Sequence, residues 1–507
     1  MNLEMGRSGM RRMLASSARD PRLRLTTPEI LRSAFIAILA LSILAFFVSY
    51  AAIGRFQAAT TAIGDETKPA AVLAEKLSVT LADMDAQVTD SSLGNGQAWS
   101  RYLADIDAAV NTTEQATRTV HTEDTEAEAL RSVQLKLRNY YQMIGGASVT
   151  SPDIFVSNEQ LAMTTTLWAS RLMRQDIIPQ AQKAAELATA KLNDAYAEFR
   201  RYTVFSTAFA LLPVVLLLAL LVAAQLFITR RTRRLVNIPL ALATLVLLGF
   251  VGWFSYVAES GRSAILTAKE DAYDDLQALY RAKVTAYLMK ADESMWLFEL
   301  RKARFEQKRL RGFYARSFGD SARQLIDVGH IADFPGAIVE GAVYTDPVDH
   351  TGVEAVKASL AAAEKQAKSG RRDEAMKLTP RIPGILGAEL RHFEESGTEW
   401  EAAYDAVTNL LSYLEIDRKI RTTALDESRD KAVQLSIGGG EGGANWAFSK
   451  MDTALDRMIA TENQSFDTRL AQATWNLSTL PAALGGVLAF TVLFAGWGLW
   501  QRYREYR

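Results

Sequence analysis

Residues 202–257, YTVFSTAFALLPVVLLLALLVAAQLFITRRTRRLVNIPLALATLVLLGFVGWFSYV, decide the fold. Two apolar runs, Tyr202–Ile228 and Leu235–Val257, flank a basic turn, and each exceeds the ~18 residues that cross a bilayer as a helix. Neither run contains Asp, Glu, Lys or Arg, and one such charge at the centre of a span costs about 2.5–3.5 kcal/mol. Ser33–Gly54 and Asn476–Trp500 have the same character. The chain is therefore predicted to cross a membrane four times.

The first run could instead be a cleaved signal peptide. Its apolar core, residues 33–54, is longer than a typical signal-peptide core, and the 32-residue tail 1–32 precedes it. We therefore interpret this run as a retained membrane anchor.

The arginines predict the orientation. The tail 1–32, the turn TRRTRR at 229–234 and the end QRYREYR at 501–507 hold 14 of the 57 Lys and Arg residues but 4 of the 58 Asp and Glu residues. Short basic segments stay in the cytoplasm. Both termini are then cytoplasmic, and the long segments 55–201 and 258–475 lie outside the cell.

The cytoplasmic arginines are candidate contacts for a soluble partner or for anionic lipid. These candidates are Arg230, Arg231, Arg233, Arg234, Arg502 and Arg504. The alternative is that they only set the topology.

Composition limits the chemistry. The chain has no Cys, so it has neither disulfides nor thiolate metal sites, and an extracytoplasmic protein without disulfides fits a bacterial plasma membrane. The four His residues are scattered, with no pair four residues apart, so we expect no zinc site. No phosphate-binding loop, zinc-protease, serine-hydrolase or kinase motif is present. We expect no catalytic residue, no cofactor and no nucleic-acid partner.

Both long segments are predicted to be helical bundles. In the first, Leu73, Leu77, Leu81, Met84 and Val88 recur at spacings of three and four, as on one face of an amphipathic helix. Similar stripes follow along the segment, and a proline at position 179 predicts a kink or a short break.

The second segment begins in the same way. Tyr273, Tyr280 and Tyr287 lie seven apart and form one aromatic helix face, which we interpret as bundle core rather than a ligand site. Residues 312–355 are richer in Gly, Pro and Asp and are expected to form a loop or small subdomain. The predicted fold class is all-α, an integral membrane protein with four spans and two extracytoplasmic bundles.

One glycine motif imitates a dinucleotide site. Gly438, Gly440 and Gly443 in LSIGGGEGGANWAF match G-x-G-x-x-G. That fingerprint requires a strand before it and a βαβ unit around it, and neither is predicted here. We interpret the glycines as a turn between antiparallel helices.

Several stretches resemble a known family. RDPRLRLTTPEI, ASRLMRQDIIPQAQ, DAYDDLQALYRAKVTAYLMKADESMWLFE, YLEIDRKIRTTALDESRDKAVQLSIGG and WGLWQRYREYR resemble the actinobacterial GlnX-like family of four-span membrane proteins. The resemblance implies that a glutamine-type solute-binding lipoprotein detects amino acids outside the cell. This chain would pass the signal to a cytoplasmic Ser/Thr kinase, protein kinase G.

The outer segments are also similar to the four-helix sensor bundles of chemoreceptors. The chain departs from chemoreceptors because it lacks their HAMP and signalling domains, so a signal would require a partner. Six residues within the family-like stretches are candidate contacts for a ligand or partner: Tyr273, Asp274, Asp292, Glu293, Asp417 and Arg421. For Asp417 and Arg421, four apart, a helix-surface ion pair is the simpler interpretation.

The sequence therefore predicts a non-enzymatic transmembrane sensor or signal relay, for which oligomerisation stays open. A membrane scaffold that organises envelope complexes is the main alternative, and an extracytoplasmic enzyme with dispersed carboxylates is a less favoured one. A cavity between bundle helices would favour direct binding of a small molecule, and a shallow charged surface would favour a protein partner.

Overall fold

The computed structural model of the protein describes residues 27–119, 125–148, 159–232, 237–300, 305–327, 350–379, 382–396, 400–426 and 428–505. These residues are almost entirely helical and contain no strand, which confirms the all-α fold class. Four continuous helical stretches are long and apolar enough to cross a membrane, which supports a multi-pass membrane protein. They are Glu29–Ser91, Thr164–Arg230, Ile238–Glu299 and Ala444–Arg504.

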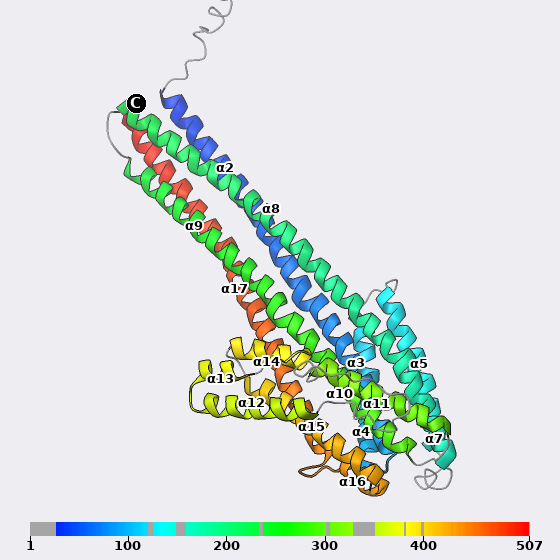
Figure 1. The fold of residues 1–507 in the computed structure, drawn as a ribbon. Coiled ribbons are helices and arrows are strands. Elements are labelled where there is room, and N and C mark those ends of the chain that lie inside the picture. The colour runs from blue at the N-terminus through cyan, green and yellow to red at the C-terminus, as the bar shows by residue number, and fades with distance from the viewer. Residues whose placement is uncertain are drawn as a thin grey trace, which may run out of the picture. The chain divides into compact units, whose positions relative to one another are not determined.

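The helices follow one another along the chain as shown in Figure 1. The first half contains α2 (Thr27–Thr61), α3 (Lys68–Ser91), α4 (Gly96–Thr119), α5 (Thr125–Ser148), α7 (Glu159–Leu172) and α8 (Ile178–Thr232). The second half contains α9 (Ile238–Thr267), α10 (Asp274–Glu299), α11 (Phe305–Leu325), α12 (His350–Lys368), α13 (Arg372–Leu378), α14 (Ile385–Ser396), α15 (Trp400–Asp426), α16 (Arg429–Ile437) and α17 (Ala444–Glu505).

Three short π-helical segments join consecutive α-helices without a break. They are η2 (Ala62–Thr67) between α2 and α3, η3 (Met173–Ile177) between α7 and α8, and η4 (Ala268–Tyr273) between α9 and α10. A π-turn carries one extra residue per turn and is often found at functional sites. The helix continues past Pro179 without the predicted break, and the irregularity near this proline is the π-helical segment η3, which ends two residues before it.

The chain folds as two compact units. The membrane unit contains the described residues up to Thr60, Glu198–Ser263 and those from Gln472 onward. The second, here called the extramembrane unit, contains Thr61–Ala197 and Ala264–Ala471.

Polar side chains link the helices of the membrane unit. Ser49 Oγ on α2 donates to the Ala210 carbonyl on α8 at 2.8 Å, and Asn237 Nδ2, just before α9, donates to the Gly498 carbonyl on α17 at 2.9 Å. The two helices of each pair lie side by side in Figure 1. A hydroxyl or amide in a bilayer gains a partner by such bonds, which hold neighbouring helices in register.

The two long segments of the chain share one core in the extramembrane unit. α3 packs along α4 and also along α10, which comes from the other half of the chain. Most residues of α3 and nearly all of the second half of α10 are buried. The buried set includes many charged side chains, such as Asp85, Lys290 and Asp292, and these organise the sites described below.

The glycine-rich stretch is a turn, as predicted. α16 ends at Ile437 and α17 begins at Ala444, and the Gly443 N–H donates to the Gly440 carbonyl at 2.9 Å. Gly442 has a φ of +89°, in the left-handed region that glycine adopts without strain.

The expectation of a loop from residue 312 is wrong for 312–325, which belong to α11. Tyr314, Phe318, Ala322 and Leu325 are buried at helical spacing, and packing of this apolar face outweighs the surrounding Gly and Asp residues. The expectation is also wrong for 350–355, which belong to α12; residues 326–327 are non-helical, and 328–349 lie outside the described residues.

Candidate functional site

A polar pocket of about 250 Å³ lies in the extramembrane unit. Side chains from α3, α4, α10 and α17 line it. The lining residues are Asp83, Ala86, Gln87, Asp90, Arg101, Tyr287, Lys290, Asn445, Phe448, Ser449 and Asp452. The α3 residues and the α17 residues each recur at spacings of three and four, so each helix presents one polar face to the pocket.

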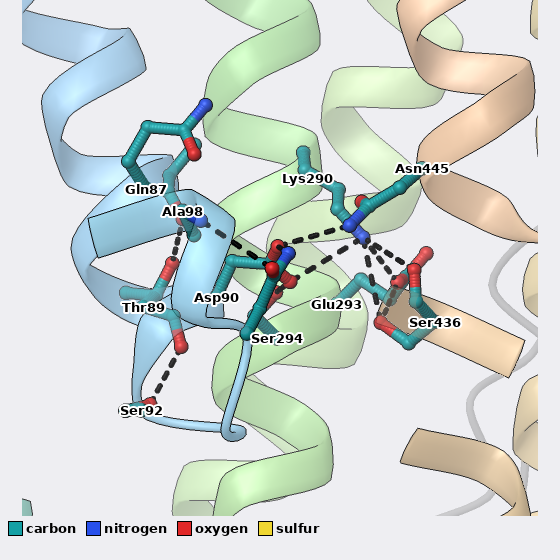
Figure 2. A network of polar contacts seen from close by, with 12 residues as sticks. Gln87, Thr89, Asp90, Ser92, Ala98, Lys290, Glu293, Ser294, Ser436 and Asn445 are labelled. Atoms are coloured by element: carbon teal, nitrogen blue, oxygen red, sulfur yellow. Dashed lines mark hydrogen bonds and ion pairs between the residues drawn. The ribbon is translucent and has the colours of Figure 1, made fainter. Parts of the chain in front are cut away.

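A network of polar side chains, drawn in Figure 2, contributes Asp90, Lys290 and Asn445 to the lining of the polar pocket. Asp90 accepts hydrogen bonds from Asn445 Nδ2 at 3.0 Å and from Asn95 Nδ2 at 2.6 Å. Lys290 Nζ lies 3.9 Å from the Asp90 carboxylate and 2.8 Å from Glu293 Oε1. Burial lowers the pKa of Lys290, but the Glu293 and Asp90 charges outweigh it and the net shift is upward. The two neighbouring carboxylates thus favour the charged form of Lys290.

Two further carboxyl groups, Asp83 and Asp452, also line the polar pocket. Burial raises the pKa of Asp83 to about 6, and the nearby charge of Asp452 adds to this effect. Gln87 Nε2 donates to Asp83 at 2.9 Å. Asp452 pairs with Lys283 Nζ at 3.1 Å. The Tyr287 phenol lies beside both carboxyl groups, and its ring packs 5.3 Å from that of Phe448.

Arg101 provides a second cation. It is exposed on α4, and its guanidinium forms no hydrogen bond or ion pair with the described part of the chain. Burial and the charge of Asp83 raise the pKa of Asp105 to about 7, and the nearby positive charge of Arg101 partly opposes this shift. The polar pocket thus combines carboxylates, carboxamides, aromatic rings and one available guanidinium.

A buried ion triad links the two halves of the chain next to this site. Arg174 Nε on η3 donates to Asp85 Oδ2 on α3 at 2.6 Å, and its NH1 bonds Asp292 on α10. Burial lowers the pKa of Arg174, but the charges of Asp292 and Asp85 raise it further than burial lowers it, so the guanidinium stays charged. A guanidinium shared by two carboxylates fixes their separation and thus the spacing of α3, η3 and α10.

Residues 466–470 of α17, here called the 466–470 segment, contact two of the π-helical segments. Asp467 pairs with Lys68, the residue that follows η2, at 2.9 Å. Arg469 donates to the Thr267 carbonyl at 2.9 Å and pairs with Asp271 in η4 at 3.1 Å.

A glycine in η2 lets the 466–470 segment approach closely. A Cβ added at Gly64 would collide with the Leu470 side chain. One stretch of α17 therefore contacts both helices that leave the predicted first and third spans.

Two of the predicted site residues belong to the buried networks. Asp292 is in the ion triad, and Glu293 pairs with Lys290 and accepts a hydrogen bond from Ser436 Oγ at 2.5 Å. Neither lines the polar pocket. Glu293 bonds the pocket residue Lys290, whereas Asp292 bonds Arg174, which does not line the pocket.

The other four predicted site residues lie apart. Tyr273 is buried with its hydroxyl 3.0 Å from Thr189 Oγ1, and Asp274 is exposed. Asp417 and Arg421 form the expected ion pair at 2.7 Å, but the pair is buried rather than on the helix surface. The Arg421 guanidinium lies 4.6 Å from the Trp296 ring centroid, so aromatic packing covers the pair.

The predicted cytoplasmic arginines are partly described. Arg230 and Arg504 are exposed, Arg502 is half-buried, and the Arg504 guanidinium stacks 4.9 Å from the Trp500 ring centroid. Arg231 lies at the end of α8, and Arg233 and Arg234 fall outside the described residues.

Sequence reasoning missed the pocket residues. Asp83, Gln87 and Asp90 lie at spacings of four and three beside an apolar stripe, and Asn445, Ser449 and Asp452 do likewise on α17. A polar face on a helix that is also apolar on its other faces was the available signal. Among the described residues no three His, Asp or Glu side chains are placed to hold a metal ion.

The fold and the pocket define a class: an all-α, multi-pass membrane protein with a polar pocket in its extramembrane helices. A family model described as an actinobacterial sensor domain matches residues 59–197, the first of the two long segments. This match supports an actinobacterial sensor family. No curated protein and no solved structure matches the chain.

Proposed function

We propose that this chain is a non-enzymatic transmembrane sensor that relays an amino-acid signal across the plasma membrane. A solute-binding lipoprotein detects the amino acid outside the cell, and a Ser/Thr kinase receives the signal in the cytoplasm. The sensor-domain match supports a sensing role for residues 59–197. The two partners rest on the resemblance of the sequence to GlnX-like proteins.

The contacts of the 466–470 segment are the observation that most directly supports a relay. It contacts η2 and η4, and each of these continues without interruption into a stretch apolar enough to span a membrane. A π-turn is an irregularity within an α-helix and is frequent at functional sites, so η2 and η4 are the points at which we expect these helices to shift. A small movement of α17 would therefore change two membrane helices together.

The output surface in this proposal is the arginine-rich end of the membrane unit. Arg230 and Arg504 are exposed. Exposed guanidinium groups bind carboxylates or phosphates of a soluble partner. The kinase would bind these groups, and its binding would change when their positions change.

Site-specific photo-crosslinking in native membranes tests both partners. A photoreactive amino acid is placed at Leu135 on α5, at Arg504, and at Leu245 on α9 as the control. Leu135 and Leu245 are both 68% exposed on the protein surface, but Leu245 lies in a predicted span, where lipid would cover it. We expect the Leu135 position to capture a solute-binding lipoprotein and the Arg504 position to capture a Ser/Thr kinase.

The yield of both products should change when glutamine, glutamate or aspartate is added. Leu245, in a predicted span, should capture neither protein. Capture of envelope-assembly proteins alone, indifferent to amino acids, would replace the relay with the scaffold.

A further inference from the structure

The polar pocket carries charges of both signs on a small cavity. Three carboxylates and two cations are among its lining residues. Their partners decide which of these charges are available to a ligand, because a charge already paired in the protein gains little from a second partner.

The carboxyl end suits an ammonium group. Asp83 accepts a hydrogen bond from Gln87, lies beside the Tyr287 phenol and has no ion-pair partner among the described residues. Asp452 shares Lys283 with Asp456. The aromatic rings of Tyr287 and Phe448 stand beside these carboxyls. Carboxylates flanked by aromatic faces bind ammonium through charge-assisted hydrogen bonds and cation–π attraction.

The cations differ in availability. Lys290 is buried and already bonds Glu293 and Ser436, so it belongs to the wall. Arg101 is exposed and forms no ion pair with the described residues. A guanidinium in this state offers several donors to an incoming carboxylate. Gln87 lies one helical turn from both Asp83 and Asp90, so it sits between the two ends of the pocket.

We propose that the polar pocket binds a small zwitterion, with its ammonium group between Asp83 and Asp452 and its carboxylate against Arg101. A free α-amino acid is the simplest ligand of this class. The proposal goes beyond the relay because it places a ligand site on the chain itself, with no lipoprotein or kinase involved. Such a ligand would contact α3, α4, α10 and α17 together.

Binding to the purified full chain in nanodiscs tests the proposal. Isothermal titration is performed with each of the twenty proteinogenic amino acids. The tightest binder is then compared with its decarboxylated amine and with its deaminated acid. We expect saturable binding of at least one amino acid and weaker binding of both analogues, by about ten- to a hundredfold, since each lacks one charge-assisted contact.

Substitutions separate the two ends of the site. Asp83→Asn should weaken the amino acid and the amine analogue alike. Arg101→Gln should weaken the amino acid by a similar factor and leave the amine analogue unchanged. Asp107→Asn and Arg118→Gln are matched controls on α4, because both residues are exposed and do not line the pocket.

A third variant keeps the proposal testable if Asp83→Asn or Arg101→Gln fails to fold. Gln87→Glu places a negative charge between the two ends and should weaken the amino acid while sparing the amine analogue. Melting temperatures without ligand show whether each variant is folded. The proposal is overturned if no amino acid binds, or if folded Asp83→Asn, Arg101→Gln and Gln87→Glu bind as the controls do. Because the lipoprotein and the kinase are absent from this assay, its failure leaves the relay standing, and failure of crosslinking leaves the pocket standing.

Discussion

The Arg174 guanidinium bonds two aspartates that come from different halves of the chain. Asp85 and Asp292 are fully buried, so neither can recover its lost hydration if the arginine is removed. Removal of one partner from a buried ion group typically costs about 3–5 kcal/mol, whereas replacement of the whole group by apolar residues is often neutral or stabilising. The triad is thus a point of high sensitivity to single substitutions.

We therefore expect Arg174→Met to lower the free energy of unfolding by about 3–5 kcal/mol. Chemical denaturation of the chain in detergent, followed by circular dichroism, measures this. Arg171→Met, one turn earlier and exposed, is the control and should change stability little. The triple variant Arg174→Met, Asp85→Leu, Asp292→Leu should regain most of the loss, and a triple variant as unstable as the single one would contradict this account.

A second titratable cluster predicts the pH dependence of stability. Burial raises the pKa of Glu389 to about 8 and that of Glu462 to about 7. The hydrogen bond to Asp275, 3.0 Å away, raises the pKa of His392 to about 9. Each folded-state pKa lies above its ordinary value, so the folded state holds more protons than the unfolded chain. Stability should accordingly fall as pH rises from about 4.5 to about 9.

We expect the melting temperature to decrease between pH 5 and pH 9, and Glu389→Gln to reduce this decrease. The amide cannot ionise, so the variant should melt above the parent chain at pH 8.5 and near it at pH 5. Glu441→Gln, on the exposed turn before α17, is the control. Thermal melts across this range measure the slope, and a slope that Glu389→Gln leaves unchanged would rule out this cluster as its source.

At the scale of residues, the sequence predicted local pairs and missed distant ones. Asp417 and Arg421 are four apart, and their ion pair follows from helical spacing alone. Asp292 was singled out, but its partner Arg174 lies 118 residues earlier, and no spacing rule connects the two. The pocket could not be predicted from the sequence for the same reason, since Asp83 and Asp452 approach each other only in the tertiary fold.

At the scale of elements, η2 is the feature whose length matters most. Its extra residue sets the rotational phase between α2 and α3. Deletion of one residue from a helix turns everything after it by about 100° and shortens it by about 1.5 Å. Both changes would alter the contact of η2 with the 466–470 segment.

We expect deletion of Asp65 to abolish the amino-acid-dependent change in crosslinking at Arg504 while leaving capture of the lipoprotein at Leu135 intact. Asp65→Ala keeps the chain length and should behave as the parent, because Asp65 is exposed. Loss of both crosslinks in the deletion variant, or of neither, would show that the phase of η2 does not transmit the signal.

The sequence predicted most elements and failed at their irregularities. Apolar periodicity located the helices of both long segments, and the glycines located the turn before α17. The π-helical segments have no comparable signal, because one extra residue within an apolar pattern looks like ordinary variation in spacing. Pro179 is the exception, since it marks the end of η3. The sequence misleads at 312–325 because its Gly and Asp residues are typical of a loop, whereas the apolar spacing of α11 determines the structure.

At the scale of the whole molecule, the predicted orientation can be tested directly. The chain has no native Cys, so every introduced thiol is unique. We expect a membrane-impermeant maleimide to label Gly440→Cys, but not Arg504→Cys, in intact cells. Both sites are exposed, and a Cβ at Gly440 meets no atom within 4 Å. Permeabilised cells should label both, and the opposite pattern in intact cells would reverse the topology.

Hydropathy and arginine placement predicted the four spans because a bilayer imposes a strong, local constraint on sequence. The core shared by α3 and α10 was not predicted. Helices from distant parts of the chain recognise each other by shape and charge complementarity, which leaves no periodic trace. The sequence therefore separated into two outer segments what the structure packs as one unit.

Because of that shared core, the first half of the chain cannot complete its folding before the second half has been synthesised. When the ribosome has completed residues 59–197, α3 still lacks α10, and the triad lacks Asp292. At ~5–20 residues per second, the 118 residues between Arg174 and Asp292 take roughly 6–24 s to synthesise, and two further spans are inserted in that time. The first half of the chain therefore stays partly folded until the second half has been synthesised. Residues 59–197 expressed alone should consequently lack a cooperative thermal transition and should exchange amide hydrogens rapidly along α3, so that the stretch matched by the sensor model would not fold by itself.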